Sequence, residues 1–225
     1  MEYEELAYKI SMTENFFHHK FILLGASRGL GWATYKALQK KFSSGEFLLI
    51  SRKILTRENE ISASTRCLAY DFSTGIAPNE FIEQLLKFEP TALIYFAGGG
   101  PFGAYQDKKW SDHLWALNVN FLFPAQLLHS LMRGNAPSLK QVVCIGSKIA
   151  EDKSDPGAAS YCAGKHALKG LISTLQRENK SPFEIKLFSP GYIQTDMLPP
   201  QSWPRKEGLA ATAENVALEL IDFLN

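Results

Sequence analysis

Short apolar runs alternate with longer amphipathic stretches along the chain. Six runs of five to seven residues are largely apolar, which is typical of strands buried on both faces of a parallel sheet. The stretches between them are long enough for helices, and glycine or polar residues separate the two kinds of segment. The predicted strands are Lys20–Gly25, Glu46–Ser51, Thr65–Asp71, Thr91–Ala97, Gln141–Ile145 and Glu184–Phe188.

The alternation of strands and helices favours one doubly wound α/β domain of Rossmann type, a parallel sheet with helices on both faces. We expect this domain to cover residues 1–225, with residues 1–19 as an N-terminal extension. Ligands of such sheets bind beyond the carboxyl ends of the strands, where the strand order reverses. The predicted helices are approximately Leu30–Lys41, Asn79–Phe88, Lys108–Met132 with a break near Pro124, Ala158–Glu178 and Ala213–Leu224.

Composition and charge are those of an ordinary globular domain, with 45% hydrophobic and 21% charged residues. The 24 basic and 23 acidic side chains give a net charge of +1 without a block of like charge, which argues against nucleic acid or a membrane surface as partner. The apolar runs are too short to span a bilayer, and the acidic start does not resemble a signal peptide. Three scattered cysteines argue against a disulfide framework or a zinc site. We expect a soluble, cytoplasmic protein without a metal.

A glycine-rich turn, Gly25 to Gly31 (GASRGLG), lies between the first strand and the first helix. A helix N-terminus offers unpaired N–H groups and a partial positive charge to a pyrophosphate, and glycines let the backbone approach it closely. The spacing G-x-x-x-G-x-G differs from the dinucleotide fingerprint G-x-G-x-x-G, and glycines also mark ordinary strand–helix turns. The position directly after the first strand favours the cofactor interpretation.

Tyr161 and Lys165 are one turn apart at the start of a predicted helix, and therefore share a helical face. A lysine ammonium beside a phenol is expected to lower the phenol pKa, so that the phenol can exchange a proton with an alkoxide or an alcohol. A Tyr–Lys pair at this spacing is common, and by itself it usually lies on the protein surface without a catalytic role. Ser147 strengthens the interpretation because it follows the fifth strand, at the sheet edge to which the helix brings Tyr161.

These motifs together resemble the short-chain dehydrogenase/reductase family, in the family's order from about Phe21 to Leu224. The resemblance implies a catalytic group of Asn118, Ser147, Tyr161 and Lys165. In it, Tyr161 protonates a carbonyl oxygen that Ser147 polarises, while Lys165 holds the nicotinamide ribose and Asn118 holds a water of a proton relay. The resemblance, with the strand-end residues, gives a cofactor site of Gly25, Ser27, Arg28, Gly29, Leu30, Gly31, Ser51, Arg52, Asp71, Phe72, Ala97, Gly98, Tyr161, Lys165, Pro190, Gly191, Ile193 and Thr195.

Three departures from the family pattern are visible. Leu24 stands where the family often has threonine, and Phe96 replaces the asparagine of an Asn-Ala-Gly motif, which is expected to place an aromatic ring near the cofactor. The chain also stops after the last helix, without the family's usual seventh strand. That strand often supports one interface of a tetramer, so we expect a homodimer.

The end of the second strand predicts the cofactor. An acid there would accept hydrogen bonds from the ribose 2′-hydroxyl of NAD(H), but the sequence reads Ser51-Arg52-Lys53. Arg52, with Arg28 in the glycine turn, is suited to the 2′-phosphate of NADP(H), although both arginines can also be solvated loop charges. We therefore expect NADP(H) in preference to NAD(H), with reduction as the working direction.

The sequence thus predicts an NADP(H)-dependent oxidoreductase that reduces the carbonyl of a small ketone or aldehyde. The alternatives are a non-catalytic NADP(H)-binding regulator or redox sensor on the same fold, and an NAD-dependent alcohol dehydrogenase. The sequence does not identify the substrate. We expect the segment Met197–Gly208 to form a short lid over the site and to select the substrate.

Overall fold

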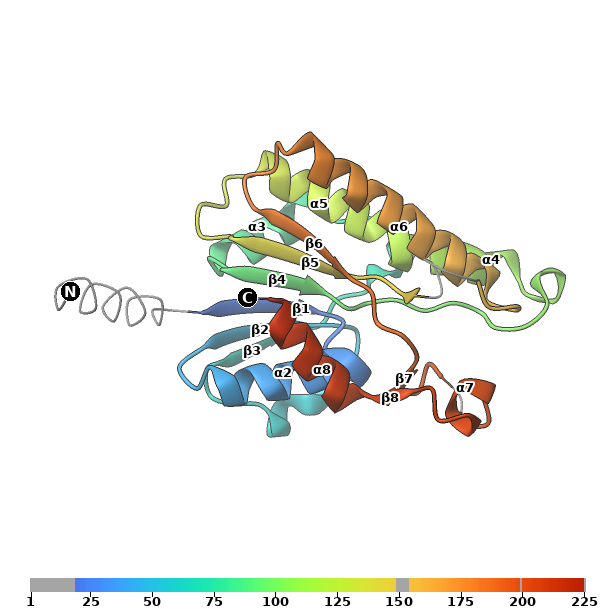
Figure 1. The fold of residues 1–225 in the computed structure, drawn as a ribbon. Helices are drawn as coiled ribbons and strands as arrows, with labels where there is room; N and C mark the ends of the chain where they lie inside the picture. Colours follow the sequence, from blue (N-terminus) through green and yellow to red (C-terminus); the bar gives the residue numbers. More distant parts are fainter. Residues whose placement is uncertain (1–18, 149–153, 199, 225) are drawn as a thin grey trace, which may run out of the picture.

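The computed structural model describes residues 19–148, 154–198 and 200–224. Its main sheet has six strands, all parallel, in the order β3-β2-β1-β4-β5-β6 (Figure 1). The predicted fold class and all six predicted strands are confirmed, and the third strand ends three residues earlier than expected. Of the predicted N-terminal extension, residues 1–18 lie outside the described part of the chain. The strands are β1 (Lys20–Leu24), β2 (Glu46–Ile50), β3 (Thr65–Leu68), β4 (Ala92–Tyr95), β5 (Gln141–Ile145) and β6 (Glu184–Phe188).

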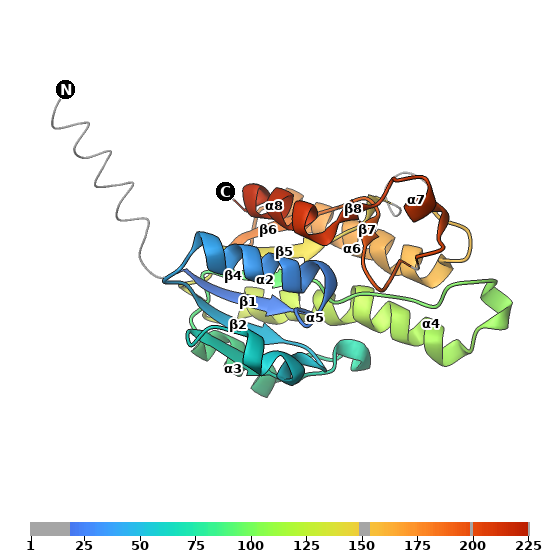
Figure 2. The same ribbon diagram turned by 90° about the horizontal axis from the view of Figure 1, so that it is seen from below.

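Helices cover both faces of the sheet, which explains why the central strands are apolar throughout. One face carries α2 (Gly29–Lys41) and α8 (Ala213–Phe223), and the other carries α3 (Asn79–Lys87), α5 (Phe123–Arg133) and α6 (Ala159–Glu178) (Figures 1 and 2). The chain adds β2 and β3 on one side of β1, then β4, β5 and β6 on the other. The strand order therefore reverses between β1 and β4, where a ligand crevice is expected.

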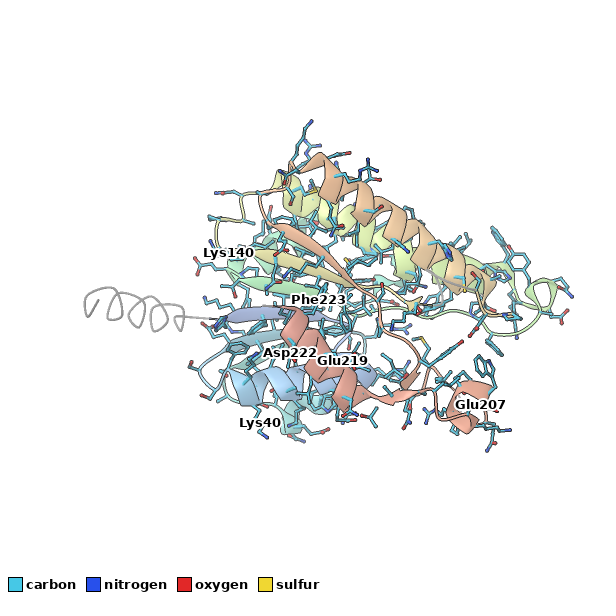
Figure 3. All side chains as sticks on the ribbon, in the orientation of Figure 1. Lys40, Lys140, Glu207, Glu219, Asp222 and Phe223 are labelled. Carbon is cyan, nitrogen blue, oxygen red and sulfur yellow. The ribbon has the colours of Figure 1, made fainter. Side chains whose placement is uncertain are left out.

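The helix α8 is amphipathic, and its sequence shows why it packs where it does. Val216, Ala217 and Leu220 are buried against α2 and the sheet, whereas Glu219 and Asp222 are exposed and project outward (Figure 3). This spacing places the apolar residues on one stripe of the helix.

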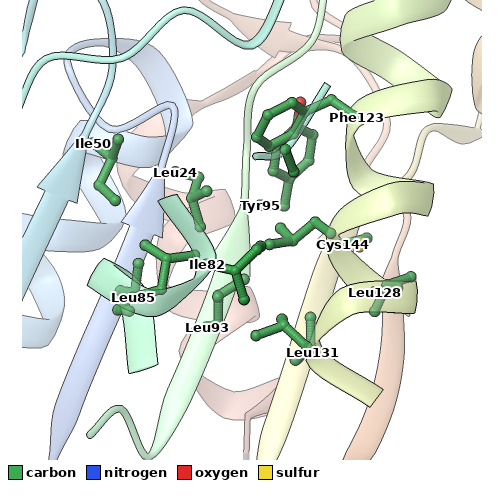
Figure 4. Close-up of a cluster of buried hydrophobic side chains, with 14 of the residues drawn as sticks. Leu24, Ile50, Ile82, Leu85, Leu93, Tyr95, Phe123, Leu128, Leu131 and Cys144 are labelled. Carbon is green, nitrogen blue, oxygen red and sulfur yellow. The ribbon is translucent and has the colours of Figure 1, made fainter. Parts of the chain in front are cut away.

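The larger core lies between the sheet and the layer formed by α3, α5 and α6 (Figure 4). Tyr95 and Phe123 are fully buried there and stack with ring centroids 5.8 Å apart. Ile82 and Leu85 of α3 pack against Leu93 of β4 in the same cluster. This core fixes the carboxyl end of β4, from which the site is built.

The long predicted helix is interrupted, as expected from Pro124. It consists of α4 (Trp110–Leu117), a π-helical turn (Asn118–Leu122) and α5. Pro124 has no N–H to give to the carbonyl of Asn120, four residues earlier. The N–H of Phe123 instead bonds to the carbonyl of Asn118, five residues earlier. Single π turns of this kind are frequent at functional sites.

Beyond the carboxyl edge of the sheet lie elements that the sequence analysis did not predict as such. A parallel pair, β7 (Ile193–Gln194) and β8 (Ala211–Thr212), frames the short helix α7 (Trp203–Lys206), which lies within the predicted lid segment (Figure 2). Residue 199 of that segment is outside the described residues. Within the described part of the chain, no helix combines the length and apolarity needed to cross a bilayer.

Candidate active site

The glycine-rich turn connects β1 to α2 at the point where the strand order reverses. Gly25 (φ +95°) and Gly29 (φ +54°) occupy left-handed backbone conformations. A Cβ atom on Gly25 would lie 2.5 Å from the backbone nitrogen of Ala97, and one on Gly31 would lie 2.6 Å from the carbonyl oxygen of Gly25. Glycine is therefore required for the turn, the start of α2 and the end of β4 to approach so closely.

The start of α2 is available to an anion. Arg28 is the N-cap residue in extended conformation, and its side chain makes no capping hydrogen bond. Its guanidinium instead lies 3.5 Å from the Asp196 carboxylate, in an ion pair that is more than 70% exposed on both sides. Leu30 is buried in the core, while the carbonyl of Ser27 accepts a hydrogen bond from Arg57 Nε at 3.2 Å. Arg57, which sequence reasoning missed, thus orders the turn from the 3-10 helix Ile54–Glu60.

The end of β2 contains groups that fit the ribose and adenine end of a dinucleotide. The Ser51 hydroxyl is buried and has no hydrogen-bond partner among the described residues. Arg52 Nε lies 3.8 Å from the Asp71 carboxylate, which also accepts the backbone N–H of Ser73 at 2.9 Å. A buried hydroxyl without a partner is costly.

Phe72, which was predicted to contact the cofactor, has its ring in the hydrophobic core. Its ring is buried and meets the rings of Tyr95 and Phe123 with centroids 5.7 and 4.9 Å away. The side chain is therefore part of the core, and any cofactor contact of this residue is left to its backbone.

Gly98 and Gly100, after β4, leave room for the side chains of Asn120, Lys165 and Tyr161. A Cβ on Gly98 would lie 2.8 Å from Asn120 Oδ1 and 3.2 Å from Lys165 Nζ. A Cβ on Gly100 would lie 3.0 Å from the Cβ of Tyr161. The chain after β4 thus passes directly between the π turn and the start of α6.

Lys165 is fully buried on α6 beneath Tyr161. Its Nζ donates a hydrogen bond to the carbonyl oxygen of Ile145 at 2.7 Å and lies 5.7 Å from the centroid of the Tyr161 ring. Burial lowers the pKa of Lys165 from its ordinary 10.5 to about 8, although the Cys144 thiolate would oppose this. The side chain is therefore still mainly an ammonium at pH 7.

Tyr161 and Ser147 meet at the carboxyl edge, as predicted from their positions after β5 and on α6. Burial raises the pKa of Tyr161, and a hydrogen bond with Ser147 acts in the opposite direction. The expectation of a phenol pKa lowered by Lys165 is therefore wrong for this structure. The physical reason is that the phenol is desolvated, whereas the ammonium lies over the ring and is bound to the Ile145 carbonyl.

The asparagine of the catalytic group requires a correction. Asn118 points away from Lys165, because its Nδ2 donates to the carbonyl oxygen of Ser73 at 2.8 Å. Asn120, two residues later, is fully buried; its Nδ2 donates to the carbonyls of Gly99 and Ala116, and its Oδ1 accepts the N–H of Gly99 at 3.3 Å. The structure brings Asn120, not Asn118, next to Lys165. Pro124 was the signal for the π turn in the sequence, but the contacts with Gly99 and Ala116 decide that Asn120 lies inward.

Leu24 and Phe96, the two residues that depart from the family pattern, both contribute to the hydrophobic core. Leu24 is fully buried at the end of β1, and Phe96 packs against the apolar cluster beneath α2 and α8. Tyr95, which precedes Phe96, donates its hydroxyl to the carbonyl oxygen of Val119 at 2.8 Å. This hydrogen bond fixes the π turn to β4.

The segment after β6 closes the site from the side opposite α6. The N–H of Lys148, next to Ser147, donates to the carbonyl oxygen of Pro190 at 3.0 Å. A Cβ on Gly29 would lie 3.1 Å from the Thr195 methyl group, and Arg205 of α7 donates to the Thr195 carbonyl at 2.6 Å. The residues from Pro190 to Thr195, with Gly191 and Ile193 between them, therefore lie between Ser147 and the glycine-rich turn.

Comparisons with known proteins agree with this geometry. Hydroxysteroid 11-beta-dehydrogenase 1-like protein B of Xenopus laevis is 26% identical, over 94% of this chain and 76% of that protein. An alcohol dehydrogenase of the archaeon Thermococcus sibiricus, solved with 5-hydroxy-NADP, has a TM-score of 0.75 at 20% identity, over 92% of this chain and 90% of that one. A 4-hydroxyisoleucine dehydrogenase solved with NADH has the same TM-score and identity, over 92% and 91%. The two structures show a shared fold, and their bound cofactors differ.

A family model described as short chain dehydrogenase matches residues 20–205. This range runs from the start of β1 into α7 and includes the glycine-rich turn and the site around Tyr161. The chain therefore belongs to the short chain dehydrogenase family of oxidoreductases.

Proposed function

We propose that this protein reduces the carbonyl group of a small ketone or aldehyde with NADPH. The observation that carries the proposal is the convergence of Ser147, Tyr161 and Lys165 at the carboxyl edge of the sheet, where the glycine-rich turn after β1 also lies. NADPH, when bound, supplies the hydride. The protein supplies orientation and the proton.

Each side chain has a separate task in this mechanism. The Ser147 hydroxyl holds and polarises the carbonyl oxygen, and the Tyr161 phenol donates the proton to that oxygen as negative charge develops on it. Burial raises the pKa of Tyr161, so the transfer depends on the negative charge that develops on the carbonyl oxygen and on the hydrogen bond with Ser147, which acts against the effect of burial. Lys165 is the ammonium beneath the phenol and binds the nicotinamide ribose. Asn120 takes the place first given to Asn118, holding the backbone of Gly99 and the water that supplies protons to Lys165.

The preference for NADP(H) over NAD(H) rests on the adenosine end of the crevice. Arg28 and Arg52 are exposed, and their carboxylate partners lie 3.5 and 3.8 Å away, too far for short hydrogen bonds. Exposed ion pairs of this kind contribute little, so a doubly charged 2′-phosphate can replace them at small cost. Assembly as a homodimer and a cytoplasmic location stay predictions.

The direct test is Tyr161→Phe, assayed by the loss of NADPH absorbance against a panel of ketones and aldehydes. Without the phenolic proton, turnover should fall by about a thousandfold, while the dissociation constant of NADPH changes by less than about twofold. Tyr105→Phe is the matched control, because Tyr105 is half exposed near α4 and outside the proposed machinery. Substantial activity in Tyr161→Phe would exclude the proton-donor role, and cofactor binding without turnover in the wild-type protein would favour a regulator.

A further inference from the structure

The phenol of Tyr192 is held by a carboxylate from another part of the chain. Its hydroxyl donates to Asp155, with distances of 2.8 and 2.7 Å to the two carboxylate oxygens. Tyr192 follows β6, and Asp155 lies in the segment between β5 and α6 that also precedes Tyr161. One hydrogen bond therefore joins the two chain segments that leave neighbouring strands at the proposed reaction site.

Other contacts extend this connection across the mouth of the site. The ring of Trp203, on α7, packs edge-on against the ring of Tyr192 at 5.5 Å. Two residues from Asp155, the carbonyl of Gly157 accepts the N–H of Gly103 at 2.9 Å. The loop after β4, the segment before α6, the segment after β6 and α7 are thus fixed to one another around Tyr192 and Asp155.

Tyr192 is not a second proton donor. Burial, the hydrogen bond to Asp155 and the charge of that carboxylate hold the pKa of Tyr192 well above its ordinary value. The N–H of Lys148, next to Ser147, donates to the carbonyl oxygen of Pro190, two residues before Tyr192, which places Tyr192 at the same edge of the sheet as the proposed proton donor. Tyr192 is therefore a neutral, fixed aromatic wall near the proton donor.

The segments around this wall, here called the rim, expose several large apolar side chains, with charged residues such as Asp196 and Lys206 between them. Four large apolar side chains are more than half exposed: Phe102 (69%), Met197 (58%), Trp203 (54%) and Leu209 (57%). Phe102 belongs to the loop after β4, and the other three flank or form α7, beyond the same edge of the sheet (Figures 1 and 2). Exposed apolar side chains on the segments around a site are suited to an apolar ligand. Asp155, and Lys148 against Gly191, place one charge of each sign nearby.

We propose that the hydrogen bond between Tyr192 and Asp155, here called the Tyr192–Asp155 latch, makes this site specific for uncharged, apolar carbonyl compounds that reach from Tyr161 to the rim. The inference rests on the proposed function. The latch holds the Tyr192 ring in place, so that a flat apolar substrate packs against it without losing free energy to ordering the wall. A charged substrate would lose hydration against the apolar side chains of the rim without gaining a dedicated partner there.

Three ketones on one scaffold test the substrate class: cyclohexanone, 4-phenylcyclohexanone and 4-oxocyclohexanecarboxylate. With the wild-type protein and NADPH, we expect kcat/KM for the phenyl compound to exceed that for cyclohexanone by about tenfold, through KM. The carboxylate should be the poorest of the three. Equal kcat/KM for all three, or a preference for the carboxylate, would overturn the assigned substrate class.

Tyr192→Phe tests the latch, because it removes the hydroxyl and keeps the ring. We expect KM for 4-phenylcyclohexanone to rise about tenfold, with KM for cyclohexanone and the NADPH dissociation constant within about twofold of wild type. Asp155→Asn keeps an acceptor oxygen, so KM for 4-phenylcyclohexanone should rise less in this variant than in Tyr192→Phe. In the double variant, which carries both Tyr192→Phe and Asp155→Asn, KM for 4-phenylcyclohexanone should rise no more than in Tyr192→Phe alone, since the two residues act as one unit.

Tyr105→Phe is again the matched control and should leave all three KM values unchanged. An equal loss for the large and the small ketone, or a parallel loss of NADPH affinity, would mean that the hydrogen bond only supports the fold, and the latch would be rejected. No change in Tyr192→Phe would also reject it.

The latch can fail separately from the proposed function. If the wild-type protein reduces none of the ketones, the proposed function fails, and calorimetric binding of 4-phenylcyclohexanone to the NADPH complex then decides the latch. About tenfold weaker binding in Tyr192→Phe supports it. Equal binding in both proteins, or no binding in either, overturns it.

Discussion

The two ends of the proposed cofactor site are held by different physical means. At the catalytic end, Lys165 and Asn120 are buried, and their polar atoms bond to backbone carbonyls of Ile145, Gly99 and Ala116. At the adenosine end, Arg28 and Arg52 lie on the surface and pair with carboxylates at more than 3 Å.

The difference follows from what each end has to do. A proton transfer needs atoms fixed to within a fraction of an ångström, and burial with backbone hydrogen bonds supplies that precision. Selection of a phosphate needs only charge at the right place, and a mobile arginine provides it. Changes at the buried end should therefore affect turnover and stability together, whereas changes at the exposed end should affect cofactor affinity alone.

The largest effect is expected from Lys165→Met, which removes the buried ammonium. Turnover should fall by about a thousandfold, because the proton path and a ribose contact are both lost. The variant should also change how the free energy of unfolding depends on pH. The folded pKa of Lys165 is lowered to about 8, so between pH 8 and 10.5 the unfolded chain binds more protons at this residue, and the Lys165 contribution to stability rises with pH. That contribution totals on the order of 3 kcal/mol. Cys144, whose pKa is raised from 9.0 to about 12, opposes it above pH 9.

Denaturant unfolding at pH 8 and pH 10 checks this sign, with turnover measured on the same samples. The pH-dependent increase should be absent in Lys165→Met. An unchanged slope in the variant would show that another group titrates in this window.

Gly25→Ala should be the next most damaging change, because it acts where the two ends of the site meet. The added Cβ would lie 2.5 Å from Ala97 N, at a backbone φ of +95°. We expect a loss of about 2–4 kcal/mol in the free energy of unfolding. Gly170→Ala is the control, since Gly170 lies in α6 with open space around it, and it should gain about 0.5–1 kcal/mol. Chemical denaturation of the two variants would separate these outcomes.

Asn120→Ala and Asn118→Ala compare two asparagines of the same π turn. Asn120→Ala should lower kcat by about thirtyfold, because the backbone of Gly99 loses its support beside Lys165. Asn118→Ala removes only the bond to Ser73 and should change kcat by less than about threefold. Steady-state kinetics with both variants decide the assignment, and a larger effect at Asn118 would return the role to that residue.

The smallest of these effects is expected at the exposed end. Arg52→Ala should weaken NADPH binding by about tenfold and NADH binding by less than about twofold, with kcat nearly unchanged. Fluorescence titration at low and high salt measures both affinities, and the difference should shrink at high salt because the contact is exposed. Equal losses for the two cofactors would remove the basis for an NADP(H) preference.

The placement of the site was more predictable than the details inside it. Ser147 and Tyr161 could be assigned to one sheet edge, because the carboxyl ends of parallel strands lie together and the following helix returns over them. The choice between Asn118 and Asn120 was not local. Only the folded contacts, of Asn120 with Gly99 and Ala116 and of Asn118 with Ser73, decide which of the two lies beside Lys165.

The direction of the Tyr161 pKa shows the same limit. Spacing along a helix indicated that Lys165 lies near the phenol, but it did not indicate how much solvent reaches the phenol or that Lys165 Nζ is bound to Ile145. The contacts between Tyr192 and Asp155, and between Arg57 and Ser27, join residues about 30 or more positions apart, so no local pattern revealed them.

The sequence by itself determined the order of strands and helices, the parallel sheet and the edge at which the chemistry lies. It could do so because apolar runs, amphipathic periods and glycines act through short-range geometry. Only the tertiary structure decided which asparagine turns inward, in which direction the phenol pKa moves and which side chains form the wall of the site. Those properties depend on desolvation and on contacts between distant segments, which exist only once the chain has folded.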